Sequence, residues 1–165
     1  MNSIDYIKMS LQASRSMLIP MIEDMKDAPL TQPTPNGGNH PLWILGHVTC
    51  AEAGIFDGFI LGQRNRFADM NESFGVGSKP TTNADDYPSV DELMAKFEEI
   101  RTVIMGYLDS ISEADLANPS NAPEKFGPKF ATIGGCLIAL TLHPVFHAGQ
   151  VADSRRVLER SPLSR

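Results

Sequence analysis

The sequence predicts an all-α fold, and three observations carry this prediction. Four long segments repeat apolar residues at helical spacing, segments rich in proline and glycine separate them, and no segment alternates apolar and polar residues as a strand would. With 165 residues, of which 42% are hydrophobic, the chain has the size and the apolar content of one domain. We therefore expect residues 1–165 to form a single four-helix bundle.

The first two helices are expected on either side of a short loop. Apolar residues recur every three or four positions over residues 3–26, where Pro20 should kink the helix because it lacks a backbone N–H. The following stretch, PLTQPTPNGG, predicts a loop, and its shortness implies that the two helices are antiparallel. The second helix should extend to about Leu61, with Asn39 as its N-cap and Pro41 in its first turn.

A long crossover is expected between the second and third helices. Residues 62–88 are rich in glycine, proline and polar residues and are too numerous for a simple turn, which indicates a crossover or a lid. The third helix begins with SVDE at residues 89–92, a capping-box pattern. An irregular segment at 112–129, with a short turn at SEADL, precedes a fourth helix near 132–160. The long crossover allows the second and third helices to run parallel, in an up-down-down-up bundle.

The composition argues against several classes of function. The net charge of −6, from 20 acidic and 14 basic residues, leaves no clustered basic face for nucleic acid. Residues 131–152 are uncharged but contain glycine, proline, histidine and glutamine, which favours a buried core helix over a membrane span. The start of the chain lacks the apolar run of a signal peptide, and two cysteines give no disulfide framework, so we expect a cytoplasmic protein. A group of arginines fits the end of the last helix and its dipole: Arg155, Arg156, Arg160 and Arg165.

The predicted fourth helix carries two histidines one turn apart. His143 and His147 project from the same face because four residues separate them, and such a pair can hold one metal ion. The alternative is a pair of ordinary core or surface histidines, but an unpaired polar group buried in apolar surroundings costs about 1–3 kcal/mol. Gln150 follows on the same stripe, either as a hydrogen-bond partner of a ligand or as a polar residue at the rim. Asp57 and Asp153 lie off the stripe and are expected to be surface charges.

The predicted second helix supplies a third histidine. His47 lies in the middle of an uncharged apolar run, and if this stripe faces the fourth helix, three imidazoles meet and leave a coordination position for water or substrate. His40 is two turns earlier, too far to share the ion, and should line a pocket or face solvent. Trp43 is expected in the core, where it can form an apolar wall beside the metal. Cys50 can bind a soft metal, but packing is the favoured role for it and for Cys136.

The combination of WILGHV with HPVFHAGQVADSRRVL resembles the DinB-like superfamily, which includes YfiT-type proteins and thiol-dependent S-transferases. The similarity covers nearly the whole chain, including YPSVDEL and ISEADL. It implies an up-down-down-up bundle, often a homodimer, with a divalent metal on three histidines, which match His47, His143 and His147. Some relatives that use mycothiol or bacillithiol have an acidic residue in place of one histidine; residue 143 is a histidine here, so the site resembles the all-histidine type. The chain departs from the family pattern at Pro144, where a good helix former is expected, and at Glu159, where relatives often have glycine.

Three kinds of function remain open at this point. The first is a metalloenzyme in which the ion activates a low-molecular-weight thiol, or water in a hydrolase, for attack on a small-molecule electrophile. Zinc fits the imidazole ligands best, and nickel, iron and manganese also accept them. The second is a non-catalytic bundle whose metal stabilises the fold or reports metal availability. The third, direct action on DNA, is suggested only by the family's name, and the acidic composition argues against it.

Overall fold

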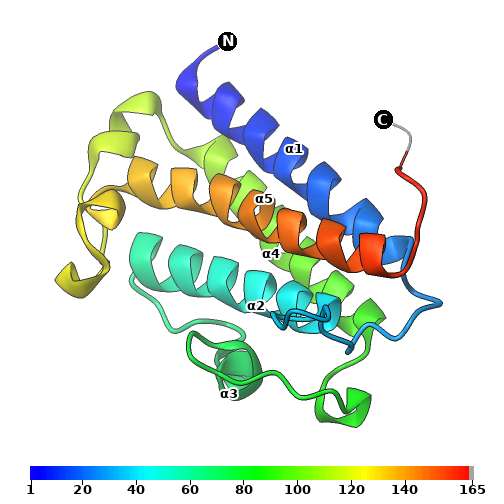
Figure 1. Cartoon of the computed structure of the whole chain (residues 1–165). Helices are drawn as coiled ribbons and strands as arrows, with labels where there is room; N and C mark the ends of the chain where they lie inside the picture. The colour runs from blue at the N-terminus through cyan, green and yellow to red at the C-terminus, as the bar shows by residue number, and fades with distance from the viewer. Residues whose placement is uncertain (164–165) are drawn as a thin grey trace.

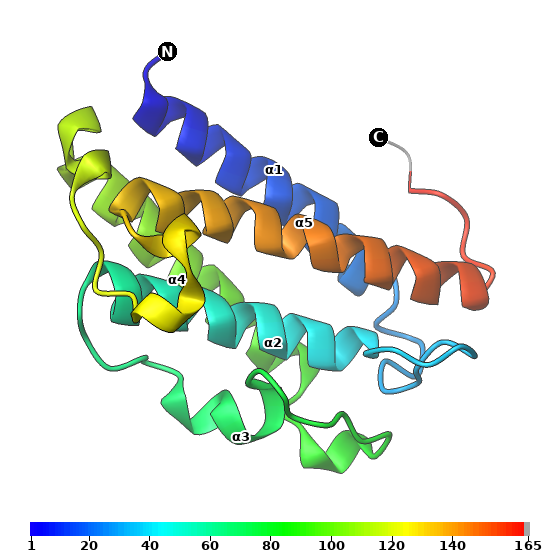
Figure 2. The same ribbon diagram turned by 60° about the vertical axis from the view of Figure 1, so that its left-hand side comes forward.

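The computed structural model describes residues 1–163, which form an all-helical fold without a strand in that range (Figure 1). The α-helices are α1 (Ser3–Glu23), α2 (Pro41–Ala53), α3 (Asn71–Phe74), α4 (Val90–Ser110) and α5 (Ile133–Val157). Among the four long helices, α5 packs against α1 and α2, and α4 packs against the same two helices from the other side (Figure 2). The predicted all-α class is thus confirmed. Arg165 of the predicted arginine group lies outside the described residues.

The helix boundaries follow local signals at most ends. Ser89 and Glu92 cap each other at the start of α4, as the SVDE pattern predicts. Helix α1 continues three residues beyond Pro20 and ends at Glu23, a little before the predicted end. The assignment of Asn39 as the N-cap of α2 is wrong, because His40 holds this position and its Nδ1 accepts a hydrogen bond from the backbone N–H of the third helical residue.

The second helix changes its geometry after Ala53. Residues Gly54–Ile60 continue it as a π-helix, so the predicted extent to about residue 61 is correct but its regular α geometry is not. Asp57 lies on this π-helix with 1% of its surface exposed, which contradicts its assignment as a surface charge. The reason is Arg66, which folds back from the crossover and donates from its backbone N–H and from its guanidinium to both carboxylate oxygens.

A buried ion pair joins three of the long helices. Arg101 of α4 donates to both carboxylate oxygens of Glu52 on α2, at 2.7 and 2.5 Å, and to the carbonyl of Leu11 on α1 at 2.8 Å. Burial raises the pKa of Glu52, and the adjacent guanidinium opposes that rise. The pair ties α2 to α1 and α4, and α2 carries His47 in its second turn.

Helix α5 combines a core face with an exposed apolar face. By length and composition it is apolar enough to cross a membrane, a test that core helices also pass, and 44% of its most apolar window is buried inside the fold. The remaining part of that window is half-buried or exposed, and three of its large apolar side chains have more than half of their surfaces exposed: Ile138, Leu142 and Phe146. Burial against α1 and α2 therefore accounts for only part of the apolar surface of this helix.

Candidate metal centre

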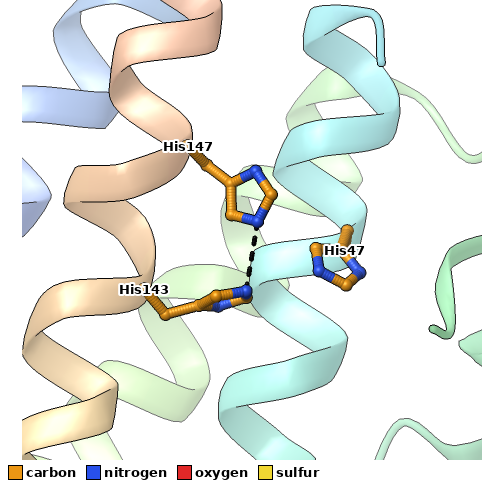
Figure 3. Close-up of side chains that lie close together, drawn as sticks. All are labelled: His47, His143 and His147. Atoms are coloured by element: carbon orange, nitrogen blue, oxygen red, sulfur yellow. Dashed lines mark hydrogen bonds between the residues drawn. The ribbon is translucent and has the colours of Figure 1, made fainter. Parts of the chain in front are cut away.

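Three histidines from two helices converge on one point between α2 and α5 (Figure 3). His47 comes from α2, and His143 and His147 come from successive turns of α5. One ring nitrogen from each lies within 4.8 Å of the others. His47 and His147 are buried, with 8% and 6% of their surfaces exposed, and His143 is partly buried. The structure thus brings together the three residues that the sequence pattern selected.

Two contacts fix the orientation of the His47 ring. Its Nδ1–H donates to the backbone carbonyl of Phe74 at 2.8 Å, which leaves Nε2 unprotonated in the neutral ring. The indole of Trp43 stacks on the imidazole, with 4.6 Å between centroids and 9° between planes. The indole N–H in turn donates to the carbonyl of Ser73 at 2.8 Å. The segment around α3 therefore holds both rings in place.

Gly46 allows this segment to approach α2. A Cβ atom at Gly46 would lie 2.2 Å from the ring of Phe74, far inside van der Waals contact. The missing side chain is therefore what lets Phe74 pack onto the helix and present its carbonyl to His47. Neither residue stood out in the sequence pattern, although a glycine inside an apolar helix is a signal of close approach.

His147 is oriented by its own helix. Its Nδ1–H donates to Oε1 of Gln150 at 2.9 Å, so Nε2 carries a lone pair. This Nε2 points at Nε2 of His143, 3.1 Å away (Figure 3). Gln150 thus contacts a candidate ligand, which is the first of the two roles expected for it.

His143 differs from the other two histidines, because no acceptor within the described residues orients its ring through Nδ1. Its Nε2 reaches His147, but its Nδ1 is the one buried side-chain nitrogen or oxygen without a hydrogen-bond partner within residues 1–163. A buried polar atom left unpaired costs about 1–3 kcal/mol. The two facing Nε2 atoms can share one proton or one cation, and in either case Nδ1 of His143 keeps no partner within the described residues.

The electrostatic environment keeps all three imidazoles neutral. Burial, followed by the neighbouring charges of His147, His47 and Lys129, lowers the pKa of His143 to about 3. Burial also lowers the pKa values of His47 and His147, and the hydrogen bonds from their Nδ1 atoms partly offset it. Neutral imidazole is the form that binds a metal ion, so the cluster is ready to act as a ligand set at neutral pH.

The donor set fits a divalent ion. Two nitrogens bound to zinc at about 2.0–2.1 Å in tetrahedral geometry lie about 3.3 Å apart, close to the 3.1 Å between Nε2 of His143 and Nε2 of His147. Three imidazoles with two Nδ1 atoms held by acceptors form the arrangement common around zinc. Such a set leaves at least one coordination position open.

Two other residues of the predicted site lie outside the cluster. His40 is 1% exposed, so its solvent-facing alternative is wrong; its Nε2–H donates to the carbonyl of Thr81 at 2.9 Å. Cys50 is buried with its Sγ 3.2 Å from Oδ1 of Asn71, and burial raises the pKa of its thiol. Both residues pack and cap α2 rather than join the three imidazoles.

Pro144 lies between the two histidines of α5 without interrupting the helix. The helix runs from Ile133 to Val157 through the buried proline, and the rings of His143 and His147 lie 4.6 Å apart between centroids. The bend that proline can impose therefore does not separate the pair.

Comparison with known proteins places the chain in a family. No curated protein gives a significant match to it. A family model described as the DinB superfamily matches residues 10–151, most of the chain, and this range includes all three histidines and the segment that supports them. The match agrees with the resemblance of WILGHV and HPVFHAGQVADSRRVL. The chain belongs to the DinB superfamily.

Proposed function

We propose that this protein binds a divalent metal ion through His47, His143 and His147 and uses it to transfer a thiol to a small electrophile. One observation carries the proposal: three neutral imidazoles face one another in a buried site, and Nε2 of His143 lies 3.1 Å from Nε2 of His147. A divalent cation held by these rings would take the lone pairs that face one another. The membership of the chain in the DinB superfamily supports the same assignment.

The side chains around the cluster have separable tasks. When bound, a divalent ion on three imidazoles lowers the pKa of a coordinating thiol or water and supplies a nucleophile at neutral pH. Phe74 and Gln150 hold two imidazoles in the tautomer that binds metal. Trp43 covers one face of His47 and excludes water from it. Phe146, exposed beside His147, offers an apolar contact for a substrate on the outer side.

The first test is the metal content of the untagged protein by elemental mass spectrometry. We expect near-stoichiometric zinc, or nickel, iron or manganese, that is lost when His47, His143 and His147 are all changed to Ala. The matched control is His40→Asn, which removes the fourth histidine but keeps a side chain that caps a helix, and it should retain the ion. Absence of metal in the wild type, even after incubation with zinc or nickel, would overturn the proposal.

The second test separates thiol transfer from hydrolysis. The metal-loaded protein is incubated with a panel of electrophiles, with and without low-molecular-weight thiols. Turnover that requires a thiol supports the transferase, whereas turnover with metal and water alone indicates a metal-dependent hydrolase. The triple histidine variant should be inactive in either case.

The burial of the cluster favours one further candidate, a bundle whose ion stabilises the fold without turnover. His47 and His147 expose less than a tenth of their surfaces, which suits a structural ion. This candidate predicts that a chelator lowers the melting temperature while no member of the substrate panel is converted. Turnover by the metal-loaded protein would exclude it.

The remaining parts of the proposal concern the order of the helices, the class of substrate and the cellular location. The long segment between α2 and α4 supports the up-down-down-up order of the family. A net charge of −6 supports a small-molecule substrate rather than nucleic acid or a membrane surface. Two buried free cysteines support a cytoplasmic location.

A further inference from the structure

We propose that Tyr87 positions the metal ligand His47 through Phe74, so that metal binding and the docking of residues 71–88 onto α2 strengthen each other. These residues, here called the docked segment, form the later part of the crossover and run along the side of α2 that faces away from α5 (Figures 1 and 2). The inference rests on the metal site proposed above and adds a means of regulating it.

One row of side chains along α2, beginning at its N-cap, holds the docked segment. Four residues at helical spacing donate side-chain hydrogen bonds of 2.8–3.2 Å to it: His40, Trp43, His47 and Cys50. The first three of them donate to backbone carbonyls within residues 73–81. His47 is the member of this row that also belongs to the histidine cluster. The docking of the segment and the orientation of this ligand therefore depend on the same hydrogen bond.

Tyr87 ties the docked segment to the start of α4. It lies two residues before Ser89, which is the N-cap of that helix. Its phenol oxygen accepts a hydrogen bond from the backbone N–H of Thr81 at 2.7 Å, and its ring lies 5.4 Å from the ring of Phe74 between centroids. Tyr87 therefore contacts the residue whose carbonyl orients His47, although it contributes no ligand itself.

The docked segment has few contacts of its own with the core. No residue of 75–92 is buried, and Val76 exposes 94% of its surface. Segments with so little buried apolar surface open locally at a lower free energy than the helices that they connect. Half-buried Tyr87 opposes such opening with two ring contacts, one to Phe74 and one to the His40 ring at 5.3 Å between centroids. Its side chain is therefore the place where a small change should loosen the segment.

The coupling acts in both directions. The hydrogen bond from Nδ1–H of His47 to the carbonyl of Phe74 selects the tautomer whose other nitrogen can bind a metal ion. Opening of the docked segment weakens this hold on the ring, and by linkage a bound ion opposes opening by the factor that opening costs in metal affinity. Loss of a ligand's hydrogen-bond partner typically costs about 10–100-fold in affinity. Because Tyr87 holds the partner and is not the partner itself, we expect the lower end of this range, about 10-fold.

The first test measures hydrogen exchange of the backbone amides of the wild-type protein by mass spectrometry, with and without saturating zinc. Exchange over residues 75–86 should slow about 10-fold with zinc, although these residues contribute no ligand. Residues 112–118, a mostly exposed segment beside the start of α5, are the internal control and should exchange equally in both samples. Zinc content is measured in the same samples. Bound zinc with unchanged exchange would overturn the coupling alone, whereas a protein that binds no zinc would overturn the metal site and the coupling with it.

The second test compares the zinc affinities of variants by competition with a chromogenic chelator. Tyr87→Ala should bind zinc about 10-fold more weakly, whereas Tyr87→Phe keeps the ring against Phe74 and should stay within about threefold of the wild type. The matched control is Tyr107→Ala, which removes a half-buried tyrosine that packs on Phe56 of the π-helix. It should lower the melting temperature without changing the zinc affinity. Equal zinc affinities of Tyr87→Ala and Tyr107→Ala would refute the positioning role of Tyr87.

Discussion

Glu159 is a non-glycine residue in the left-handed region, and its replacement by glycine should stabilise the protein. It follows the C-cap of α5 with φ of 53°. Its N–H donates to the carbonyl of Arg156 at 3.0 Å, and the N–H of Arg160 donates to that of Arg155 at 3.1 Å, which is a Schellman motif with glutamate where glycine is preferred. The left-handed conformation costs a non-glycine residue about 1–2 kcal/mol. The greater freedom of glycine in the unfolded chain cancels roughly 0.4–1 kcal/mol of this gain.

The net gain for Glu159→Gly is therefore about 1 kcal/mol, or about 2–4 °C in melting temperature for a domain of this size. Loss of the carboxylate also helps by relieving its repulsion from the negative end of the helix dipole. Glu159→Ala also removes the carboxylate but leaves a non-glycine residue in the left-handed region. The difference in stability between the two variants therefore isolates the cost of the backbone conformation. Urea and thermal unfolding of both variants provide the measurement. If glycine were no more stable than alanine at this position, the assignment of strain to the backbone of residue 159 would be refuted.

Three further predictions concern the metal centre. In the metal-free protein, His143 binds a proton near pH 6.5 in the unfolded chain but not in the folded one, where its pKa is lowered to about 3. Acidification from pH 6.5 to 4.5 should therefore lower the free energy of unfolding by about 2 kcal/mol, as measured by urea titration. An unchanged midpoint of unfolding would contradict this. Gly46→Ala forces Phe74 away from α2 and should cost about 1–3 kcal/mol and weaken metal binding. Its control, Gly106→Ala, meets no atom within 4 Å and should be neutral or stabilising. In metal titrations, His143→Glu should retain an ion, whereas His47→Glu should lose it, because Phe74 and Trp43 hold the His47 ring and no acceptor holds Nδ1 of His143 within the described residues. Equal metal affinities of the two variants would contradict this difference.

The fold could be predicted where local chemistry decides it. The capping box at Ser89 and the apolar spacing of the four long helices are short-range signals, and the structure follows them. The failures occur where distant contacts override local preference. His40 displaces Asn39 as the N-cap because the carbonyl of Thr81, far along the chain, holds its ring. Asp57 is buried because Arg66 folds back onto it, which no helical spacing announces.

The sequence predicted the three histidines of the candidate site but not the groups that orient their rings. Four-residue spacing placed His143 and His147 on one face, and the uncharged stripe around His47 indicated the facing helix. The acceptor for His47 is a backbone carbonyl, and a carbonyl gives no signal in the sequence because every residue has one. Gly46 was the available clue, since a glycine inside an apolar helix points to close contact with another segment.

The three histidines differ in how much the protein depends on their imidazole rings. His47 is held on one side by an acceptor and on its face by the indole of Trp43, so a carboxylate there would meet the carbonyl of Phe74 as a second acceptor and lose the stacking. Within residues 1–163, His143 has no acceptor on Nδ1, and its only polar contact is with His147. A carboxylate at 143 would leave no buried Nδ1 unpaired and would still offer an oxygen to the ion. Of these two positions, 143 is therefore the one where this scaffold can exchange one ligand for another at the lower cost to its fold.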